Sequence, residues 1–357
     1  MSTTTPGFSS SPIPVLDSVP GIAYAIVRPD GIHAMDAAGF ADIDRNIPTS
    51  TEMVSPWFSM TKLMTATVTL LTSGRGLLDL DEPIVRHVPA MGILRPAADA
   101  QHITARHLLS HSAGLANPLP IRWIHPADRL GPDPESFLLA QLEKHPKLRF
   151  APGARCSYSN LGALILGAAL TAVTSKAFVD LVRDEILDPL RMRTTGFTYV
   201  RGTERASAIG YHPRWNALRL LLPRWVIDRP TGRWVSLRPF LVDGAPYGGL
   251  VGSLEDAARF LQMHLRDGEL EGAQVLTTEA ARSMREIRVK GRRYDLGLGW
   301  FRPAKDRRAD PPYVQHLGGG AGFFNVMRIY PTEGVGAVVM GNATKFDIEP
   351  VARLALA

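Results

Sequence analysis

The 357-residue sequence contains a single cysteine, Cys156, so an internal disulfide bond is excluded. A lone cysteine fits a reducing compartment. The opening segment, MSTTTPGFSSSPIPVL, has neither the basic region nor the apolar stretch that is typical of a secretory signal peptide. We therefore predict a flexible polar arm over residues 1–17 and a cytoplasmic location.

Long hydrophobic runs are also lacking. The longest apolar run, Leu161–Val173, has 13 residues, whereas a helix needs about 20 to cross a bilayer. This run predicts a buried core helix. With 45% hydrophobic residues, a chain of this length can bury a large core.

Acidic residues are scarce in two segments. None lies between Glu52 and Asp79. Between residues 201 and 240, eight arginines are opposed only by Glu204 and Asp228, so this segment carries +6, which equals the formal charge of the whole chain. Nucleic-acid binding requires a basic face together with a recognisable reader module, and the sequence shows no such module. We predict no nucleic-acid partner.

The arginine-rich segment 201–240 also contains three tryptophans and a Leu-Leu-Leu run. One interpretation is a packed insert, in which the arginine stems cover apolar surface. The other is a lid over a substrate pocket, or a patch that contacts a membrane surface or another subunit, because basic and aromatic residues together favour lipid headgroups. The oligomeric state does not follow from the sequence.

Strand patterns lie at both chain ends. Gly21–Pro29 and Ile32–Asp42 flank a Pro-Asp-Gly turn and predict a β-hairpin. Strands return in LGLGWFRP, FFNVMRIYP and VGAVVMGN near the C-terminus. Between them, helical periodicity marks four segments, which are Met60–Thr72, Leu161–Val173, Lys176–Ile186 and Leu254–Leu265. Ser253 precedes the last as a predicted N-cap.

This order predicts an α+β fold. Both chain ends form one antiparallel sheet flanked by helices, and a mainly helical subdomain is inserted between them. We place the α/β subdomain at residues 18–85 and 285–357, and the helical subdomain at 86–284, including the arginine-rich insert.

The segment FSMTK places Ser59 where a predicted strand meets a helix, with Lys62 one turn later on the same face. The first turn of a helix presents unpaired N–H groups and a partial positive charge. A lysine acts as a base only when it is neutral, which burial away from carboxylates favours. The pair is therefore either a nucleophile with its base or a capped helix with a surface lysine.

Two further motifs, Tyr158-Ser159-Asn160 and the segment HLGG at His316–Gly319, lie later in the chain. Each is weak by itself. In this order and spacing the three motifs resemble the serine β-lactamase and penicillin-binding superfamily, especially class C β-lactamases, D-alanyl-D-alanine carboxypeptidases and family VIII carboxylesterases. Segments such as ITARHLLSHSAGL and YGGLVGSLEDAARF extend the resemblance over roughly residues 18–345.

The resemblance implies a catalytic role for three residues. Ser59 matches the family nucleophile, and Lys62 matches the base or proton shuttle beside it. Tyr158 matches the tyrosine that takes the serine proton and returns one to the leaving group. Acyl transfer through a covalent intermediate follows from these roles and requires no cofactor.

It also implies a substrate-binding group, which comprises Asn160, His316, Gly318 and Gly319. Asn160 would orient the substrate and Lys62, and the N–H groups of Ser59 and Gly319 would form the oxyanion hole. His316 stands where many relatives carry lysine.

The histidine at position 316 affects which class of substrate we expect. It is mostly neutral at pH 7, which weakens the case for carboxylate-bearing lactams and peptides and favours neutral esters. Lys345 or an arginine of segment 201–240 would have to supply a missing charge. We predict a serine hydrolase of short-chain carboxylic esters, with a small-molecule ester or amide as its partner. D-Ala-D-Ala carboxypeptidase, β-lactamase and a penicillin-binding sensor without turnover are the alternatives.

Other chemical features carry less weight. His107 and His111 have a spacing that suits zinc on a helix, but no HExxH pattern accompanies them, and we predict no metal site. The glycine run Gly318–Gly322 lacks the Lys-Ser/Thr of a phosphate loop. Cys156 is most simply a small core residue.

Overall fold

The computed structural model describes residues 17–200 and 207–357. Nearly all of the predicted N-terminal arm therefore lies outside the described residues. The same holds for Arg201, Glu204 and Arg205 of the arginine-rich segment.

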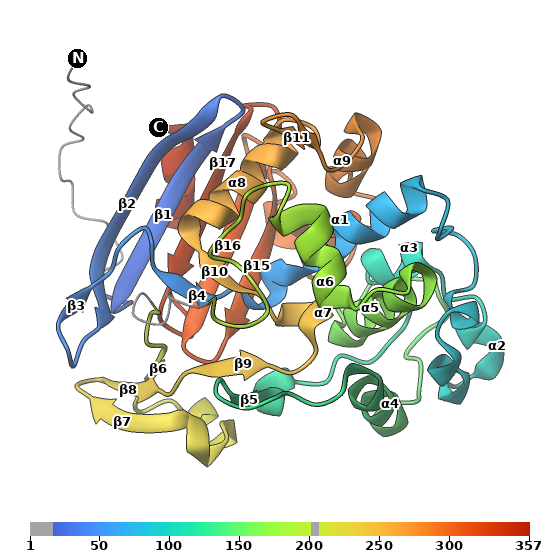
Figure 1. The fold of residues 1–357 in the computed structure, drawn as a ribbon, viewed down its shortest axis with the longest axis horizontal. Coiled ribbons are helices and arrows are strands. Elements are labelled where there is room, and N and C mark those ends of the chain that lie inside the picture. Colours follow the sequence, from blue (N-terminus) through green and yellow to red (C-terminus); the bar gives the residue numbers. More distant parts are fainter. Residues whose placement is uncertain (1–16, 201–206) are drawn as a thin grey trace.

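The fold is built on an antiparallel sheet of eight strands in the order β13-β14-β15-β16-β17-β1-β2-β3. Strand β1 pairs with β2 on one side and with β17 on the other, so the N-terminal hairpin joins the C-terminal strands directly (Figure 1). The predicted α+β architecture is confirmed. The strands are β1 Gly21–Arg28, β2 Gly31–Asp42, β3 Ile47–Pro48, β13 Tyr294–Leu296, β14 Phe301–Pro303, β15 Val314–Gly320, β16 Phe323–Tyr330 and β17 Val335–Gly341.

Side chains alternate between the two faces along each strand. At the centre of the sheet, both faces are covered by other parts of the protein. On β1, Ala23 and Ala25 belong to the large core that includes helix α8 (Leu254–Leu265), whereas Ile22 packs with Val351 near the C-terminus. The short C-terminal helices α10 (Glu349–Ala352) and η10 (Arg353–Leu356) lie on this second face.

Most of the other helices lie beside the β15 end of the sheet (Figure 1). They are η1 Phe58–Met60, α1 Thr61–Gly74, α2 Ala97–Ala100, α3 Ala105–Leu109, α4 Pro134–Lys144, α5 Asn160–Thr174, α6 Phe178–Val182, α7 Ala245–Gly248 and α9 Thr278–Arg285. Helices α1, α5 and α7 pack on one another, and α1 and α5 are buried over most of their length. Helix α1, which contains Lys62, and helix α5, which begins at Asn160, therefore meet in the core.

Helix α5 contains the long apolar run. Within the described ranges, no single helix has the length and hydropathy of a membrane span, and only α5 taken together with the helical segment Phe178–Leu187, bent by 84°, reaches them. The residues of α5 are mostly buried inside the protein, as expected for a core helix.

Two local predictions were wrong in detail. The predicted helix Lys176–Ile186 begins later, and α6 continues as a π-helical turn, Arg183–Leu187. LGLGWFRP forms two short strands, β13 and β14, because Gly299 turns the chain at φ 109°. The described part of the arginine-rich segment, residues 207–240, forms the small sheet β6-β8-β7 with 3-10 turns. Its strands are β6 Tyr211–Pro213, β7 Ile227–Thr231 and β8 Trp234–Leu237.

Two smaller strand pairs lie outside the main sheet. β4 (Val54–Pro56) pairs with β10 (Val251–Ser253), and β5 (Ile124–Pro126) pairs with β9 (Phe240–Val242). Strand β4 leads into η1 and α1, so it fixes where the FSMTK segment begins. Ser253 caps α8 as predicted, because its Oγ accepts a hydrogen bond from the Asp256 N–H at 3.2 Å.

Candidate active site

A cleft of about 630 Å³ lies beside strand β15 and is lined by Ser59, Tyr158, His316 and Gly319. These four predicted site residues are up to 260 positions apart in the sequence and share one cavity. Its size is within the range of small-molecule sites.

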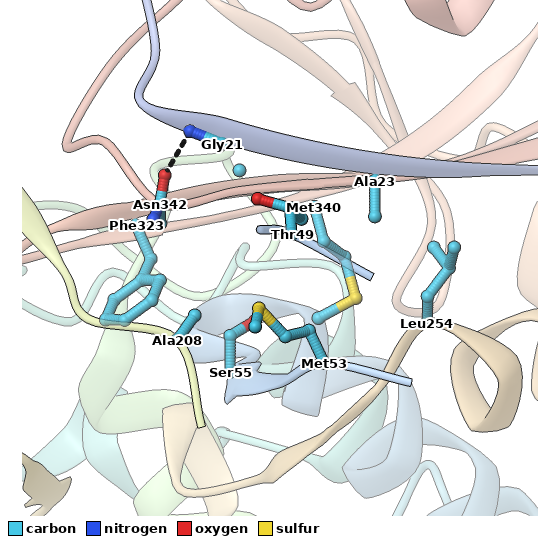
Figure 2. A pocket seen from close by; sticks show the side chains of 11 residues that line it. Gly21, Ala23, Thr49, Met53, Ser55, Ala208, Leu254, Phe323, Met340 and Asn342 are labelled. Atoms are coloured by element: carbon cyan, nitrogen blue, oxygen red, sulfur yellow. Dashed lines mark hydrogen bonds between the residues drawn. The ribbon is translucent and has the colours of Figure 1, made fainter. Parts of the chain in front are cut away.

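A second cavity, under the start of β1, is far smaller (Figure 2). Its volume is about 20 Å³, which suits a single water molecule. Met53, Ser55 and Met340 line it, and Asn342 beside them accepts a hydrogen bond from the Gly21 N–H at 2.7 Å. None of the predicted site residues reaches this cavity, so the larger cleft is the candidate substrate site.

A strained turn presents Ser59 to the cleft. Phe58 has a φ of 47°, in the left-handed region that residues with side chains rarely adopt. Its ring packs near those of Phe240 and Phe323, at centroid distances of 6.1 and 6.5 Å, which holds this conformation in place. Strain of this kind is concentrated at functional sites.

Lys62 is buried, with 5% exposure, so the alternative of a surface lysine is excluded. Its Nζ lies 3.0 Å from Ser59 Oγ, 2.8 Å from Asn160 Oδ1 and 2.7 Å from the Tyr247 carbonyl oxygen. None of these three partners is a carboxylate. Burial holds the pKa of Lys62 well below its usual value. Asn160 lies at the start of α5, and its Oδ1 is one of the acceptors around the amine.

The Tyr158 ring is packed against the ring of His111, with centroids 4.4 Å apart. His111 Nδ1 accepts a hydrogen bond from the Ser159 N–H at 3.2 Å, and its carbonyl accepts one from the Ser157 N–H at 2.9 Å. The residues on both sides of Tyr158 are therefore fixed to His111. Burial, with a contribution from Lys62, lowers the pKa of His111 to about 3, so this ring is neutral at pH 7.

Tyr158 is protonated in the free protein. Burial raises the pKa of its phenol, and the hydrogen bond to Ser59 acts in the opposite direction without overcoming this effect. Lys62 Nζ lies 5.0 Å from the centre of the same ring. Ser59, Lys62 and Tyr158 are thus in mutual contact.

His316 lies on β15 and faces the cleft. Its Nδ1 is 2.9 Å from the Leu317 carbonyl, and because a carbonyl only accepts, Nδ1 carries the proton. Nε2 is buried and has no hydrogen-bond partner among the described residues. Burial, reinforced by the charge of Lys62, holds the pKa of His316 well below its usual value. The ring is therefore neutral, and its Nε2 is a hydrogen-bond acceptor.

The two predicted glycines occupy different places. Gly319 lines the cleft, whereas a Cβ on Gly318 would lie 2.0 Å from the Trp57 carbonyl oxygen. Gly318 thus allows β15 to pack against the turn that carries Ser59, and it does not line the cleft. Strand β14 pairs with β15 only at Phe301 and Gln315, which leaves the following residues of β15 without a strand on that side in the described structure.

Some of the sequence features to which we gave little weight adjoin the cleft, but none of them forms a metal site in the described residues. His107 Nδ1 accepts from the Thr104 N–H at 3.3 Å at the start of α3, so it does not share a ligand set with His111. The described residues contain no cluster of three His, Cys, Asp or Glu that could hold a metal. Cys156 lines the cleft, and burial raises the pKa of its thiol.

The arginine-rich insert packs behind the site. Leu222, Val226 and Leu237 form a buried cluster with Phe58, the residue before Ser59. Of its described residues, 207–240, none lines the cleft, and neither does Lys345. These contacts support the packed-insert interpretation over the lid. The exposed Trp215 and Leu220, at 85% and 76%, leave membrane-surface contact as an untested prediction.

His111 and the Tyr247 carbonyl are the positioning groups that sequence reasoning missed. His111 was considered only as a zinc ligand, although the segment ITARHLLSHSAGL that contains it was part of the family resemblance. The contact from Tyr247 comes from its backbone, which no side-chain pattern reveals.

Known proteins resemble this chain over most of its length. Residues 14–357 match the Beta-lactamase family. The D-alanyl-D-alanine-carboxypeptidase/endopeptidase AmpH of Escherichia coli strain K12 is 27% identical over 290 residues, which cover 79% of this chain and 69% of AmpH. Penicillin-binding protein 4 of Amycolatopsis lactamdurans is 26% identical over 345 residues, 92% of this chain and 83% of that protein. The D-amino acid amidase of Ochrobactrum anthropi SV3 has the same fold, with a TM-score of 0.78 at 23% identity over 95% of this chain and 94% of the amidase.

Proposed function

This chain belongs to the beta-lactamase family, and from that premise we propose that it hydrolyses short-chain carboxylic esters through an acyl-enzyme on Ser59. The family confirms the resemblance predicted from the three sequence motifs and makes the protein a serine hydrolase of the β-lactamase and penicillin-binding superfamily. The observation that carries the proposal is the contact between Ser59 Oγ and the buried amine of Lys62.

Acylation begins with the proton of Ser59. A neutral amine has two N–H groups and one lone pair. The N–H groups of Lys62 are directed to the Asn160 and Tyr247 oxygens, which leaves the lone pair for the Ser59 hydroxyl. As Ser59 Oγ bonds to the substrate carbonyl carbon, its proton passes to Lys62 and not to Tyr158, because the Tyr158 phenol is already protonated. The N–H groups of Ser59 and Gly319 then stabilise the oxyanion.

Tyr158 completes the exchange of protons. The bond from the carbonyl carbon to the leaving oxygen breaks, and the Tyr158 phenol gives its proton to that oxygen. Lys62, whose Nζ is 5.0 Å from the Tyr158 ring centre, restores the proton. In the second half-reaction a water molecule gives up a proton by the same route, attacks the acyl carbon and releases Ser59 with its proton restored.

His316 supports esters as the preferred substrates. Its neutral ring provides an acceptor at Nε2 instead of the permanent charge that lysine would bring. Binding of a substrate carboxylate beside β15 is therefore less favourable here than in relatives that carry a lysine at this position. Esters also have better leaving groups than peptide amides, so they require less of the Tyr158 acid.

A second candidate is a D-alanyl peptide. The relative AmpH carries the name D-alanyl-D-alanine-carboxypeptidase/endopeptidase, and its similarity covers 79% of this chain. The same Ser59 chemistry would then act on an amide bond, with Tyr158 protonating the amine.

A substrate panel distinguishes the candidates. We would measure kcat/KM for 4-nitrophenyl butyrate, a chromogenic cephalosporin and a D-Ala-D-Ala peptide, with the Ser59→Ala variant as the blank. The proposal predicts the highest value for the ester and none above background for Ser59→Ala. Faster hydrolysis of the cephalosporin or the peptide would reject the ester preference, and slow release after one equivalent would indicate a sensor.

A further inference from the structure

The Leu-Leu-Leu run of the arginine-rich segment is divided between the core and the surface. It lies at the end of the 3-10 helix η7 (Ala217–Leu221). Consecutive side chains of a 3-10 turn point about 120° apart, so three neighbouring leucines cannot all face the core. Leu222 is buried in the cluster that contains Phe58, whereas Leu220 and Leu221 are 76% and 44% exposed. Trp215, a few residues earlier, is 85% exposed.

Packed residues hold this exposed stretch at both ends. Figure 1 shows β7, β8 and the 3-10 turns before β7 as the yellow part of the ribbon, at the lower edge of the molecule. Pro213 pairs with Trp234 at the end of β6, and Val226, which follows the exposed stretch, is completely buried. The large apolar side chains between them therefore stay on the surface of an anchored segment.

The charge of the insert is strongly positive. Residues 207–240 contain six arginines and one acidic residue, Asp228, so this stretch carries +5. Asp228 binds Arg229 at 3.0 Å and Arg238 at 3.4 Å. Three other arginines have no ion pair with a carboxylate in residues 17–200 or 207–357, and these are Arg214, Arg219 and Arg224. The unpaired arginines thus belong to the same stretch as the exposed apolar side chains.

This combination favours one kind of partner. The guanidinium carbon of Arg214 lies 5.0 Å from the centre of the Trp215 ring, so a cation and an amphipathic ring are presented together. Tryptophan prefers the headgroup level of a bilayer, and anionic lipids attract arginine. A nucleic acid would match the charge but not the exposed leucines. A second copy of this chain would set the same positive surface against itself, which like-charge repulsion opposes.

We propose that segment 214–224 docks on an anionic membrane surface. Its three exposed apolar side chains enter the boundary between headgroups and acyl chains, and its three arginines pair with lipid phosphates. We call this set the interfacial patch, which comprises Arg214, Trp215, Arg219, Leu220, Leu221 and Arg224. The inference goes beyond the reaction at Ser59 and does not depend on the class of substrate.

Sedimentation with vesicles tests the proposal on the full chain. We would measure the partition coefficient of wild-type protein into vesicles of phosphatidylcholine alone and of phosphatidylcholine with phosphatidylglycerol in equal parts. The value for the anionic vesicles should be at least about ten-fold higher, and this ratio should shrink as the salt concentration rises from about 0.05 M to about 0.5 M. Equal partitioning into the two kinds of vesicle, or partitioning into neither, would overturn the proposal.

Two triple variants separate the patch from the net charge of the protein. Changing Arg214, Arg219 and Arg224 together to Gln should lower partitioning into the anionic vesicles by at least about ten-fold. The control removes the same charge from exposed arginines of other elements that have no carboxylate partner in the described chain, namely Arg28, Arg193 and Arg308. Partitioning of the control should stay within about two-fold of wild type. Equal losses in the two variants would overturn the proposal.

Trp215 reports insertion without relying on the folding of the arginine variants. It is the most exposed of the described tryptophans. Anionic vesicles that contain brominated phosphatidylcholine should quench the fluorescence of wild-type protein and should quench Trp215→Phe protein much less. Equal quenching of the two proteins would overturn the proposal. So would light scattering that shows a wild-type dimer without vesicle binding, because a second copy of the chain would then cover the interfacial patch.

Discussion

The amine nitrogen of Lys62 lies 3.0 Å from the hydroxyl oxygen of Ser59, inside the protein rather than on its surface. The side-chain oxygen of Asn160 and the backbone carbonyl oxygen of Tyr247 accept the two N–H groups of a neutral amine. Burial without a carboxylate partner favours that neutral form. One side-chain contact thus joins the nucleophile to a group able to accept its proton.

Removal of either proton-transfer partner should impair the chemical step. Lys62→Ala and Tyr158→Phe should each lower kcat for 4-nitrophenyl butyrate by about 10²-fold or more, because each removes a positioned acid or base. Lys144→Ala, which changes an exposed lysine at the end of α4, should keep wild-type activity. Activity retained in both of the first two variants would reject the assigned roles.

The pH dependence should follow Lys62 and not His316. Activity needs neutral Lys62, so kcat/KM should rise with pH, with a midpoint below the ordinary lysine range because burial lowers the pKa of Lys62. Burial also holds the pKa of His316 well below its usual value, so its titration should produce no break near pH 6.5. The profile of His316→Gln should keep the same ascending limb. A break near pH 6.5 that vanishes in this variant would show that His316 titrates in the working range.

Gly318→Ala should separate β15 from the turn at Ser59. The new Cβ would lie 2.0 Å from the Trp57 carbonyl oxygen, so the strand must shift. We expect a loss of about 1–3 kcal/mol in the free energy of unfolding, typical of overpacking, together with a lower kcat. Gly74→Ala is the control, because no atom lies within 4 Å of its added Cβ. Equal melting temperatures and rates in the two variants would contradict this packing role.

His264 should make the protein sensitive to acid. It is buried between Phe260 and Trp300, and neither ring nitrogen has a partner in the described chain. Burial and Arg285, opposed by Asp267, lower its pKa to about 3. The unfolded chain therefore binds the proton more readily, and stability falls as the pH drops from 6.5 toward 3.

A single histidine with a pKa of 6.5 in the unfolded chain and about 3 in the folded protein lowers the free energy of unfolding by about 2 kcal/mol when the pH falls from 7.5 to 5. His264→Leu, which keeps an apolar side chain of similar size, should remove that part of the loss. Urea titrations of both proteins at the two pH values measure it. An identical loss in His264→Leu and wild type would show that His264 is not responsible.

Local patterns predicted the elements whose signals are local. The hairpin of β1 and β2 and the helices α1, α5 and α8 follow from side-chain periodicity and from the Ser253 cap. No local pattern predicted the strands of the arginine-rich segment, because β6 and β8 pair across about 20 residues.

Local patterns were not sufficient to predict the site. The residues of the three motifs come together only through tertiary packing, and their proximity could be predicted from the family resemblance alone. The same resemblance did not assign Gly318 to packing, because its neighbour, the Trp57 carbonyl, is a backbone atom distant in sequence.

Covalent labelling of Ser59 tests the central claim most directly. Wild-type protein and Ser59→Ala protein would be treated with a fluorophosphonate, digested and analysed by peptide mass spectrometry. The account predicts one phosphonylated residue, Ser59, in wild-type protein, loss of esterase activity in step with labelling, and no adduct in Ser59→Ala protein. Labelling of another residue, or an unlabelled Ser59 in inactivated protein, would contradict the assignment of Ser59 as the nucleophile.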